Sequence, residues 1–221
     1  MPCHPSIVRE AAHAQRDNER MPSTSDIVAF SDDGPPAGET PWVVEPSSAP
    51  IAVVDPDPSW PAVFAGVAER VRGALGARAL QIEHVGSTAV PGLPAKPVID
   101  VDLIVASPAD QGAWCPALEQ AGFTLTVREP CWHEHRMLKL AEPRTHLHVF
   151  SPDAPEPWKH RIFRDHLRRE AGDRDLYAHV KREAATLATT AGESMMAYNA
   201  RKQAVIREIY ARAFRAAGLA A

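Results

Sequence analysis

The most informative segment of this chain reads HVGSTAVPGLPAKPVIDVDLIV and spans residues 84–105. It predicts a short apolar strand that ends at Gly86-Ser87, a loop rich in glycine and proline, and a second strand that carries Asp100 and Asp102. Side chains alternate between the two faces of a strand, so both aspartates are expected on one face. Neighbouring carboxylates repel each other unless a cation lies between them, and Mg²⁺ prefers oxygen ligands of this kind. We therefore predict that Asp100 and Asp102 bind a divalent metal ion.

The turn before the loop has the features of a phosphate-binding site. Gly86 lets the backbone approach a ligand closely, and Ser87 offers a hydroxyl beside the exposed amides of a turn or helix start. The prolines of residues 91–97 stiffen the loop, so that less entropy is lost when the site is ordered. Lys96 follows in this loop and is expected to neutralise a phosphate. Phosphate-binding and metal-binding groups on adjacent elements indicate a site that handles nucleotides.

This combination of motifs resembles two known patterns. Gly-Ser followed by Asp-x-Asp on the next strand is similar to the signature of the nucleotidyltransferase superfamily, which has the fold of DNA polymerase beta. The longer string from Ile82 to Asp100 resembles the GrpB family, a branch of that superfamily, and the resemblance extends over residues 53–214. It implies an α/β (α+β) fold, with a nucleotidyltransferase-like mixed β-sheet flanked by helices and a helical C-terminal segment.

Hydrophobic periodicity and chain breakers predict the elements of this fold. Strands are expected at residues 51–54, 80–85, 98–105, 123–127, 136–140 and 146–150. A turn at residues 55–61 is expected to lead into a helix that ends near residue 75, and further helices are expected at residues 107–121, 157–170, 174–187 and 194–217.

The first 50 residues differ in composition from the rest of the chain. They are rich in Pro, Ser, Asp and Ala without a lasting period, which predicts a mostly disordered N-terminal extension. Residues 27–30 and 42–44 are the apolar pieces of this extension that we expect to dock locally. Residues 51–217 are predicted to form one domain, with the sheet core in residues 51–150 and the helical part in residues 151–217.

The strand at residues 146–150 departs from the pattern of the superfamily. Superfamily enzymes place a third carboxylate on this strand to complete a two-metal site, whereas this chain has His146 and His148 there. The GrpB pattern shows the same His-Leu-His. We consider His148 as a metal ligand, which would favour Mn²⁺ or Zn²⁺ over Mg²⁺, as a base, or as a hydrogen-bond donor to phosphate. The alternative is a pair of ordinary strand histidines.

A second group of histidines lies in the preceding loop. His133 and His135 flank Glu134 and would share a face if this piece is extended. Together with His146 and His148 they would form a zinc site, since histidine is the commonest transition-metal ligand. Loop histidines without such a role are the alternative.

Further basic residues are expected to hold phosphates. Arg136 and Lys139 lie on one predicted strand, where a guanidinium can bind phosphate in a bidentate manner. In the C-terminal helices, the strings Phe163-Arg164-Asp165-x-Leu167 and Tyr198-x-x-x-Lys202 also resemble the family pattern. Arg164 and Lys202 are therefore expected to reach the site. Charged groups on a solvent-exposed face are the alternative for each.

Composition limits the remaining function classes. The net charge of -4 argues against a general nucleic-acid binder. The cysteines have no C-x-x-C spacing, so neither a zinc ribbon nor a disulfide framework follows, and a reducing, cytoplasmic location is expected. No apolar run approaches the roughly 20 residues of a membrane helix, and the N-terminus does not resemble a signal peptide.

Three functions remain open at this point. The leading hypothesis is the transfer of a nucleotidyl group from a nucleoside triphosphate to an unknown small-molecule or protein acceptor, with Mg²⁺ or Mn²⁺ held by the aspartates. In it, Gly86, Ser87, Lys96, Arg164 and Lys202 would hold phosphates.

The second hypothesis is a non-catalytic nucleotide-binding or regulatory module. The resemblance implies a link to coenzyme A metabolism, because this family is also found fused to dephospho-CoA kinase. The chain itself has no G-x-x-x-x-G-K-[ST] motif, so a Walker-type kinase is not expected. The third hypothesis is a histidine-metal hydrolase built on the two histidine pairs.

Overall fold

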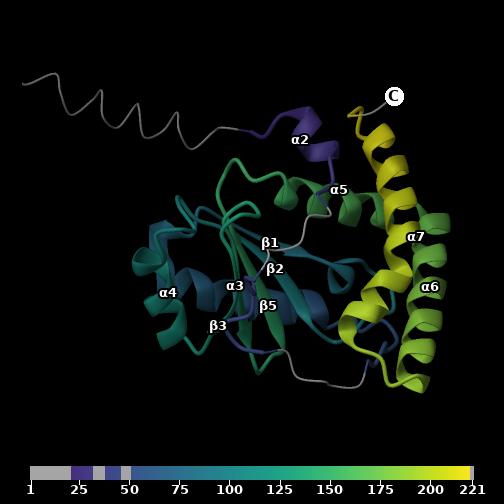
Figure 1. The fold of residues 1–221 in the computed structure, drawn as a ribbon, viewed down its shortest axis with the longest axis horizontal. Helices are drawn as coiled ribbons and strands as arrows, with labels where there is room; N and C mark the ends of the chain where they lie inside the picture. Colours follow the sequence, from purple (N-terminus) through teal and green to yellow (C-terminus); the bar gives the residue numbers. More distant parts are fainter. Residues whose placement is uncertain (1–20, 32–37, 46–50, 220–221) are drawn as a thin grey trace, which may run out of the picture.

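The computed structural model describes residues 21–31, 38–45 and 51–219 of the 221-residue chain. Its centre is a five-stranded mixed sheet with the order β1-β2-β5-β4-β3 (Figure 1). The strands are β1 (Gln81–Val85), β2 (Ile99–Ile104), β3 (Thr124–Glu129), β4 (His135–Leu140) and β5 (Thr145–Phe150). The pair β2–β5 is parallel and the other pairs are antiparallel. The predicted mixed α/β fold is therefore confirmed.

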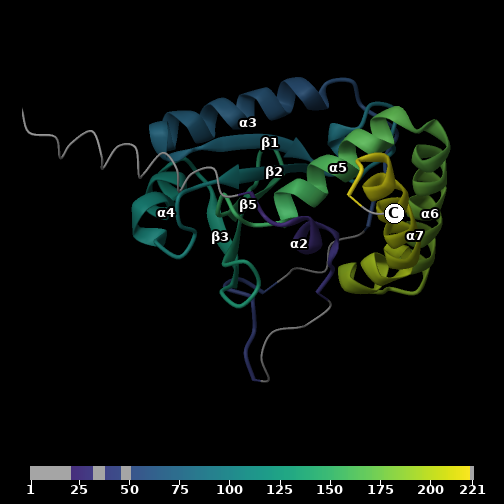
Figure 2. The same ribbon diagram turned by 90° about the horizontal axis from the view of Figure 1, so that it is seen from above.

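The helices divide between the sheet and a separate C-terminal group. They are α2 (Thr24–Val28), α3 (Trp60–Leu75), α4 (Gln111–Gln120), α5 (Glu156–Arg169), α6 (Ala171–Thr190) and α7 (Met195–Ala216). Figures 1 and 2 show α6 and α7 side by side at one end of the sheet, while α3 runs along the strands β1 and β2.

One face of the sheet is covered by α3 and α4 and forms the main core. Val67, Val71 and Leu75 recur every four residues of α3 and are buried, as expected for the apolar stripe of an amphipathic helix. They pack with the alternate residues Val101 and Leu103 of β2. Because strand side chains alternate, this packing turns Asp100 and Asp102 to the opposite face.

The C-terminal helices pack against the loop that follows β1. Leu167 of α5 is 1% exposed and shares a buried cluster with Val90 and Leu93 of this loop and with Ile209 of α7. Arg168 of α5 also donates two hydrogen bonds, of 3.0 and 2.8 Å, to the carbonyl oxygen of Ala89. The helical group is thus fixed to the Gly86 loop, and this contact positions its side chains beside the sheet.

Most predicted elements lie within a few residues of the observed bounds, with two differences. The strand expected at residues 51–54 is reduced to one bridge between Val54 and Ala95, since prolines on both segments cannot donate to a longer ladder. The helix expected from residue 107 begins at Gln111. Its predicted first turn is a bend, in which the Asp110 amide donates to Ser107 Oγ at 3.4 Å.

Parts of the N-terminal segment dock on the domain. Ser23 caps α2, and Ile27 is 3% exposed in a cluster with Tyr210 and Phe214 of α7. Trp42 forms a bridge with Val127 of β3. The local docking expected for residues 27–30 and 42–44 agrees with these contacts. Disorder was expected for residues 1–50, of which residues 1–20, 32–37 and 46–50 fall outside the described residues. The division of the chain into segments stays a prediction.

No helix in the described ranges is both long enough and apolar enough to cross a membrane.

We predict that Leu167→Ala lowers the free energy of unfolding by about 2–5 kcal/mol, because it opens a cavity where α5 meets the Gly86 loop. For a chain of this length the melting temperature should fall by roughly 2–4 °C per kcal/mol. Leu176→Ala is the control, because Leu176 is 38% exposed on α6 and should change stability by no more than about 0.5 kcal/mol. If the two variants lost the same free energy of unfolding in urea denaturation, the buried packing of Leu167 against the Gly86 loop would be contradicted.

Candidate functional site

The site is built around the turn that follows β1. The antiparallel register pairs Val85 with Asp100, so the next residue, Gly86, lies against the Asp100 side chain. Gly86 has a φ of 68°, and a side-chain carbon added there would collide with the Asp100 carboxylate. Only glycine satisfies both conditions without strain. The turn at Gly86 therefore lies against β2 at Asp100, and Ser87 follows immediately.

A cavity of about 200 Å³ opens between this turn, the sheet and the C-terminal helices. We call it the cationic hollow because three lysines from three elements line it. Lys96 comes from the loop, Lys181 from α6 and Lys202 from α7. The other groups that matter for its chemistry are Ser87, Asp100, His146, Tyr177 and Tyr198.

The three ammonium groups are held by aromatic rings and not by carboxylates. Lys181 Nζ lies 5.1 Å from the centre of the Tyr177 ring, and Lys202 Nζ lies 3.9 Å from that of Tyr198. Lys96 Nζ is 5.5 Å from the Tyr198 ring and hydrogen-bonds to Met195 Sδ. Lys181 is 3% exposed, and its Nζ has no hydrogen-bond partner within the described ranges. Cation–π contact offsets only part of the cost of burying such charges.

Burial makes these lysines weaker bases than usual. Burial, and secondarily the Lys202 charge, lower the pKa of Lys181 to about 7. Burial, with a further effect of Lys96, lowers the pKa of Lys202 to about 8. The Asp100 charge opposes both shifts but does not cancel them. The hollow therefore favours a bound anion, because an anion would neutralise the ammonium groups.

Asp100 lies among groups that can bind a metal ion. The parallel register of β2 and β5 pairs Asp100 with His146 and Asp102 with His148. One ligand atom from each of Asp100, His146 and His148 lies within 4.8 Å of the others. A set of two imidazoles and one carboxylate suits a transition ion such as Mn²⁺ or Zn²⁺ better than Mg²⁺, which prefers oxygen alone.

His148 has the orientation and the charge state of a metal ligand. Its Nδ1 is 3.0 Å from Nε2 of His135, whose Nδ1 is 2.7 Å from a carboxylate oxygen of Glu129. These two hydrogen bonds leave Nε2 of His148 as the ring nitrogen that can bind a metal ion. Hydrogen bonds of this kind orient metal-bound histidines. Burial, and then the neighbouring His135, hold the pKa of His148 well below its usual value, so the ring is neutral.

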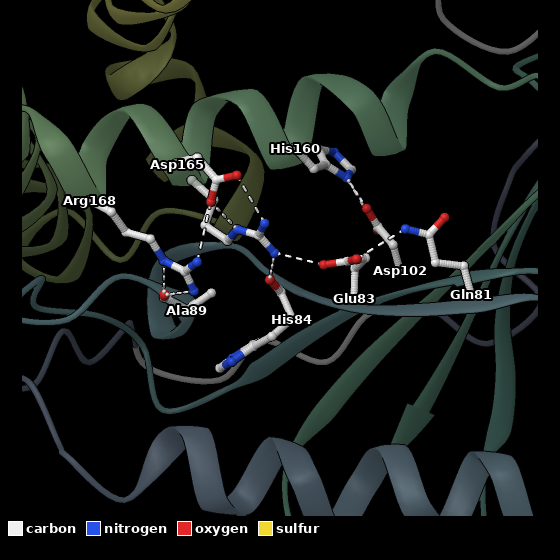
Figure 3. Close-up of polar contacts among 9 residues, drawn as sticks. Gln81, Glu83, His84, Ala89, Asp102, His160, Asp165 and Arg168 are labelled. Carbon is white, nitrogen blue, oxygen red and sulfur yellow. Dashed lines mark hydrogen bonds and ion pairs between the residues drawn. The ribbon is translucent and has the colours of Figure 1, made fainter. Parts of the chain in front are cut away.

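The expectation that both aspartates bind the metal stays a prediction, and Asp102 lies outside the grouped donors of the described part of the chain. It is 1% exposed, and His160 Nδ1 of α5 lies 2.9 and 3.2 Å from its two oxygens (Figure 3). Burial disfavours the charged imidazole, but the charge of Asp102 and this hydrogen bond outweigh it and raise the pKa of His160 to about 9. Asp102 is thus committed to an ion pair that ties α5 to β2.

Two arginines that were predicted to bind phosphate have protein partners in the structure. Arg136 pairs in register with Val149, so it lies on the core face of the sheet, where it donates to the backbone oxygens of Glu134 and His135. Strand alternation is the reason, because it separates Arg136 from the site-facing His135. Arg164 donates to Glu83 and Asp165, which already balance its charge, and to the carbonyl oxygen of His84.

The predicted four-histidine zinc site is not assembled either. His133 Nε2 faces Glu156 at 3.9 Å, and within the described part of the chain it is not among the grouped donors. His135 contacts the donor set, which consists of Asp100, His146 and His148, only through its hydrogen bond with His148.

Lys181 and Tyr177 were missed, although the sequence contains a signal for them. Tyr177-x-x-x-Lys181 on α6 repeats the spacing of Tyr198-x-x-x-Lys202 on α7. The i,i+4 spacing places each lysine over its own tyrosine, as the structure shows. The signal for His160 is absent, because its partner Asp102 is 58 residues away.

Comparison with known proteins identifies relatives of the whole domain. The family model for the GrpB protein matches residues 50–212. The chain belongs to the GrpB family. A UPF0157 protein of Halalkalibacterium halodurans is 45% identical over 77% of this chain and 86% of its own length. A solved GrpB structure from Enterococcus faecalis is 28% identical, with a TM-score of 0.65 over 74% of this chain and 98% of that one.

Another relative of this GrpB chain is a longer protein. A dephospho-CoA kinase of Mycolicibacterium paratuberculosis is 33% identical over 75% of this chain, and the match covers 46% of that protein.

We predict that Lys181→Met stabilises the protein below pH 7. The folded state holds Lys181 at a pKa of about 7 against its ordinary 10.5, so protonation favours the unfolded chain. The wild type should therefore gain stability as pH rises from about 7 to 10.5, while Lys181→Met lacks this gain. The variant should be more stable by on the order of a few kcal/mol at pH 6, and the difference should shrink with rising pH in urea denaturation.

Lys159→Met is the matched control for this experiment. Lys159 is 2% exposed but forms an ion pair with Glu156, so its removal leaves a carboxylate unpaired and should destabilise the protein. If Lys181→Met had a lower free energy of unfolding than the wild type at pH 6, the conclusion that Lys181 is buried without a compensating partner would be wrong.

Proposed function

We propose that this GrpB protein binds a nucleoside triphosphate with a divalent metal ion in the cationic hollow and transfers the nucleotidyl group to an acceptor. One observation carries the proposal. Three lysines from separate elements meet in one hollow beside Ser87 and beside the donor set of Asp100, His146 and His148. Such a combination supports a ligand that is both multiply charged and metal-bound.

The charge of the hollow supports a polyphosphate over a singly charged ligand. Lys96, Lys181 and Lys202 face one carboxylate of the hollow, Asp100, which also belongs to the donor set. A monoanion would leave buried ammonium charge without a partner, whereas the oxygens of a triphosphate offer each lysine a charge-assisted hydrogen bond.

The residues of the hollow have separate roles in the proposed transfer. Lys96, Lys181 and Lys202 hold the phosphates that leave as pyrophosphate, and the Ser87 hydroxyl holds the phosphate nearest Asp100. Asp100, His146 and His148 hold the ion, and the His135–Glu129 chain fixes the ring of His148. The ion supplies neutralisation of the charge that develops on the phosphoryl oxygens. The donor set favours Mn²⁺ for this role.

A second candidate is a nucleotide-binding module without turnover that regulates a neighbouring enzyme. The match to about half of a dephospho-CoA kinase supports it, because the rest of that protein lies outside the match. This candidate predicts nucleotide binding but no release of pyrophosphate. A histidine-metal hydrolase would use Asp100, His146 and His148 as well, but it gives the three lysines no role.

We predict that a nucleoside triphosphate with Mn²⁺ stabilises the wild type against heat, and that Asp100→Asn abolishes this effect. At about 100 times its dissociation constant the ligand should add ~2.7 kcal/mol, which is roughly 5–10 °C for this length. The measurement is thermal unfolding with ATP, GTP, CTP and UTP, each with and without Mn²⁺.

Asp102→Asn tests whether the metal ion is bound by Asp100 with the histidines of β5 or by both aspartates. We expect it to keep the Mn²⁺-dependent shift, because Asp102 is paired with His160. Loss of the shift in Asp102→Asn alone would mean that the ion lies at the other aspartate. Pyrophosphate release from the stabilising nucleotide, measured with a metabolite extract as the source of acceptor, distinguishes the transferase from the binding module.

A further inference from the structure

A second hollow of about 190 Å³ adjoins the cationic hollow. The two share Gly86, Ser87 and Tyr177 as lining residues, so they meet at the turn after β1. Its remaining walls come from α5 and α7 and carry no lysine. We call it the aromatic hollow because of the rings that line it.

Three rings of the aromatic hollow form a connected group. The centroid of Phe163 lies 4.5 Å from that of Tyr210 and 5.6 Å from that of Tyr177. Leu167 and Ile206 complete the apolar lining. Tyr177 and Tyr210 are less than 10% exposed, whereas Phe163 and Ile206 are half-buried and lie at its accessible side. Such a lining suits a flat, weakly polar group that can stack on aromatic rings.

Besides the hydroxyls of Ser87 and its tyrosines, the aromatic hollow has His160 and Arg164, which differ in what they can still bind. Arg164 is engaged by Glu83, Asp165 and the His84 carbonyl. His160 uses Nδ1 for Asp102 (Figure 3), which makes Nε2 the ring nitrogen that is left for a bound molecule. The aromatic hollow therefore offers apolar contact, the Nε2 of His160 and a few hydroxyls as directional polar groups, but no cluster of charge for a second anion.

We infer that the aromatic hollow binds the base and sugar of the nucleotide whose phosphates lie in the cationic hollow. The inference rests on the proposed function and extends it. A nucleotide has the two halves that the two hollows fit, a polyanion and a flat ring system, and these halves are joined covalently. The two hollows are likewise joined, because both are lined by the turn at Gly86 and Ser87.

Two features favour the base and sugar over a separate acceptor as the occupant of the aromatic hollow. The hollow is joined to the phosphate-binding one, and its rings can stack on a base. Stacking on aromatic side chains serves every base, since each has a π-face. His160 Nε2 then lies where it can hydrogen-bond to a base or ribose. Nucleotides should consequently bind more tightly than inorganic tripolyphosphate, which fills the cationic hollow alone.

Two probes and one pair of variants test the inference. Isothermal titration with Mn²⁺ present compares inorganic tripolyphosphate with ATP, GTP, CTP and UTP on the full chain. We expect at least one nucleotide to bind tenfold or more tightly than tripolyphosphate. Ile206→Trp should fill the aromatic hollow and remove this preference, while the affinity for tripolyphosphate stays within twofold. Ala204→Trp is the control, because Ala204 is exposed on the same helix and lines neither hollow.

The outcomes separate this inference from the proposed function. If tripolyphosphate binds as tightly as every nucleotide, or if Ile206→Trp keeps the preference, the aromatic hollow does not hold the nucleoside and an acceptor becomes its occupant. If neither tripolyphosphate nor a nucleotide binds, the proposed function fails and the inference fails with it.

A measurement on the wild type covers the case in which Ile206→Trp does not fold. In saturation-transfer NMR with the tightest nucleotide, the base protons should receive the strongest saturation, because methyl groups and rings surround them. Base protons without saturation would place the base in solvent and overturn the inference.

Discussion

The close contact between Gly86 and the Asp100 carboxylate sets the position of the turn and of the elements that pack on it. Because Gly86 has no side chain and a φ of 68°, the turn after β1 can fold directly onto β2. That places Ser87 beside the donor set and makes the turn the common wall of both hollows. The C-terminal helices pack on the same loop through Leu167 and Arg168, so the lysines that they carry reach Asp100 as a consequence of this one turn.

The cationic hollow also has a cost in stability, which supports the proposed binding of an anion there. A buried Lys181 with no hydrogen-bond partner in the described part of the chain is an unfavourable choice for folding alone, and an apolar side chain of similar volume would pack there without a desolvation penalty. The contrast with Lys159, equally buried but paired with Glu156, shows that the fold can balance a buried ammonium group where nothing needs to bind it.

The sequence predicted the parts of the site that local pattern determines, and it failed where distant elements meet. Gly86, Ser87, Lys96 and Asp100 belong to one continuous segment, whose two strands pair as neighbours, so their proximity could be foreseen. The pairing of Asp102 with His160 depends on how α5 crosses the sheet, which no spacing reveals. Arg136 is a different error, since strand alternation already separates it from His135. Lys181 could have been found from the repeated Tyr-x-x-x-Lys spacing.

The histidines of β5 explain how the site can differ from an all-carboxylate metal centre while keeping its geometry. The parallel register places His146 opposite Asp100, on the strand where the superfamily pattern implies a third acid, and His148 follows on the same face. Replacing acids by neutral imidazoles removes negative charge from a hollow that already holds three lysines. The lysines then act on the ligand instead of on the protein's own carboxylates. In the proposed function, a softer ion and a strongly anionic ligand would thus both follow from the same substitution of histidine for acid.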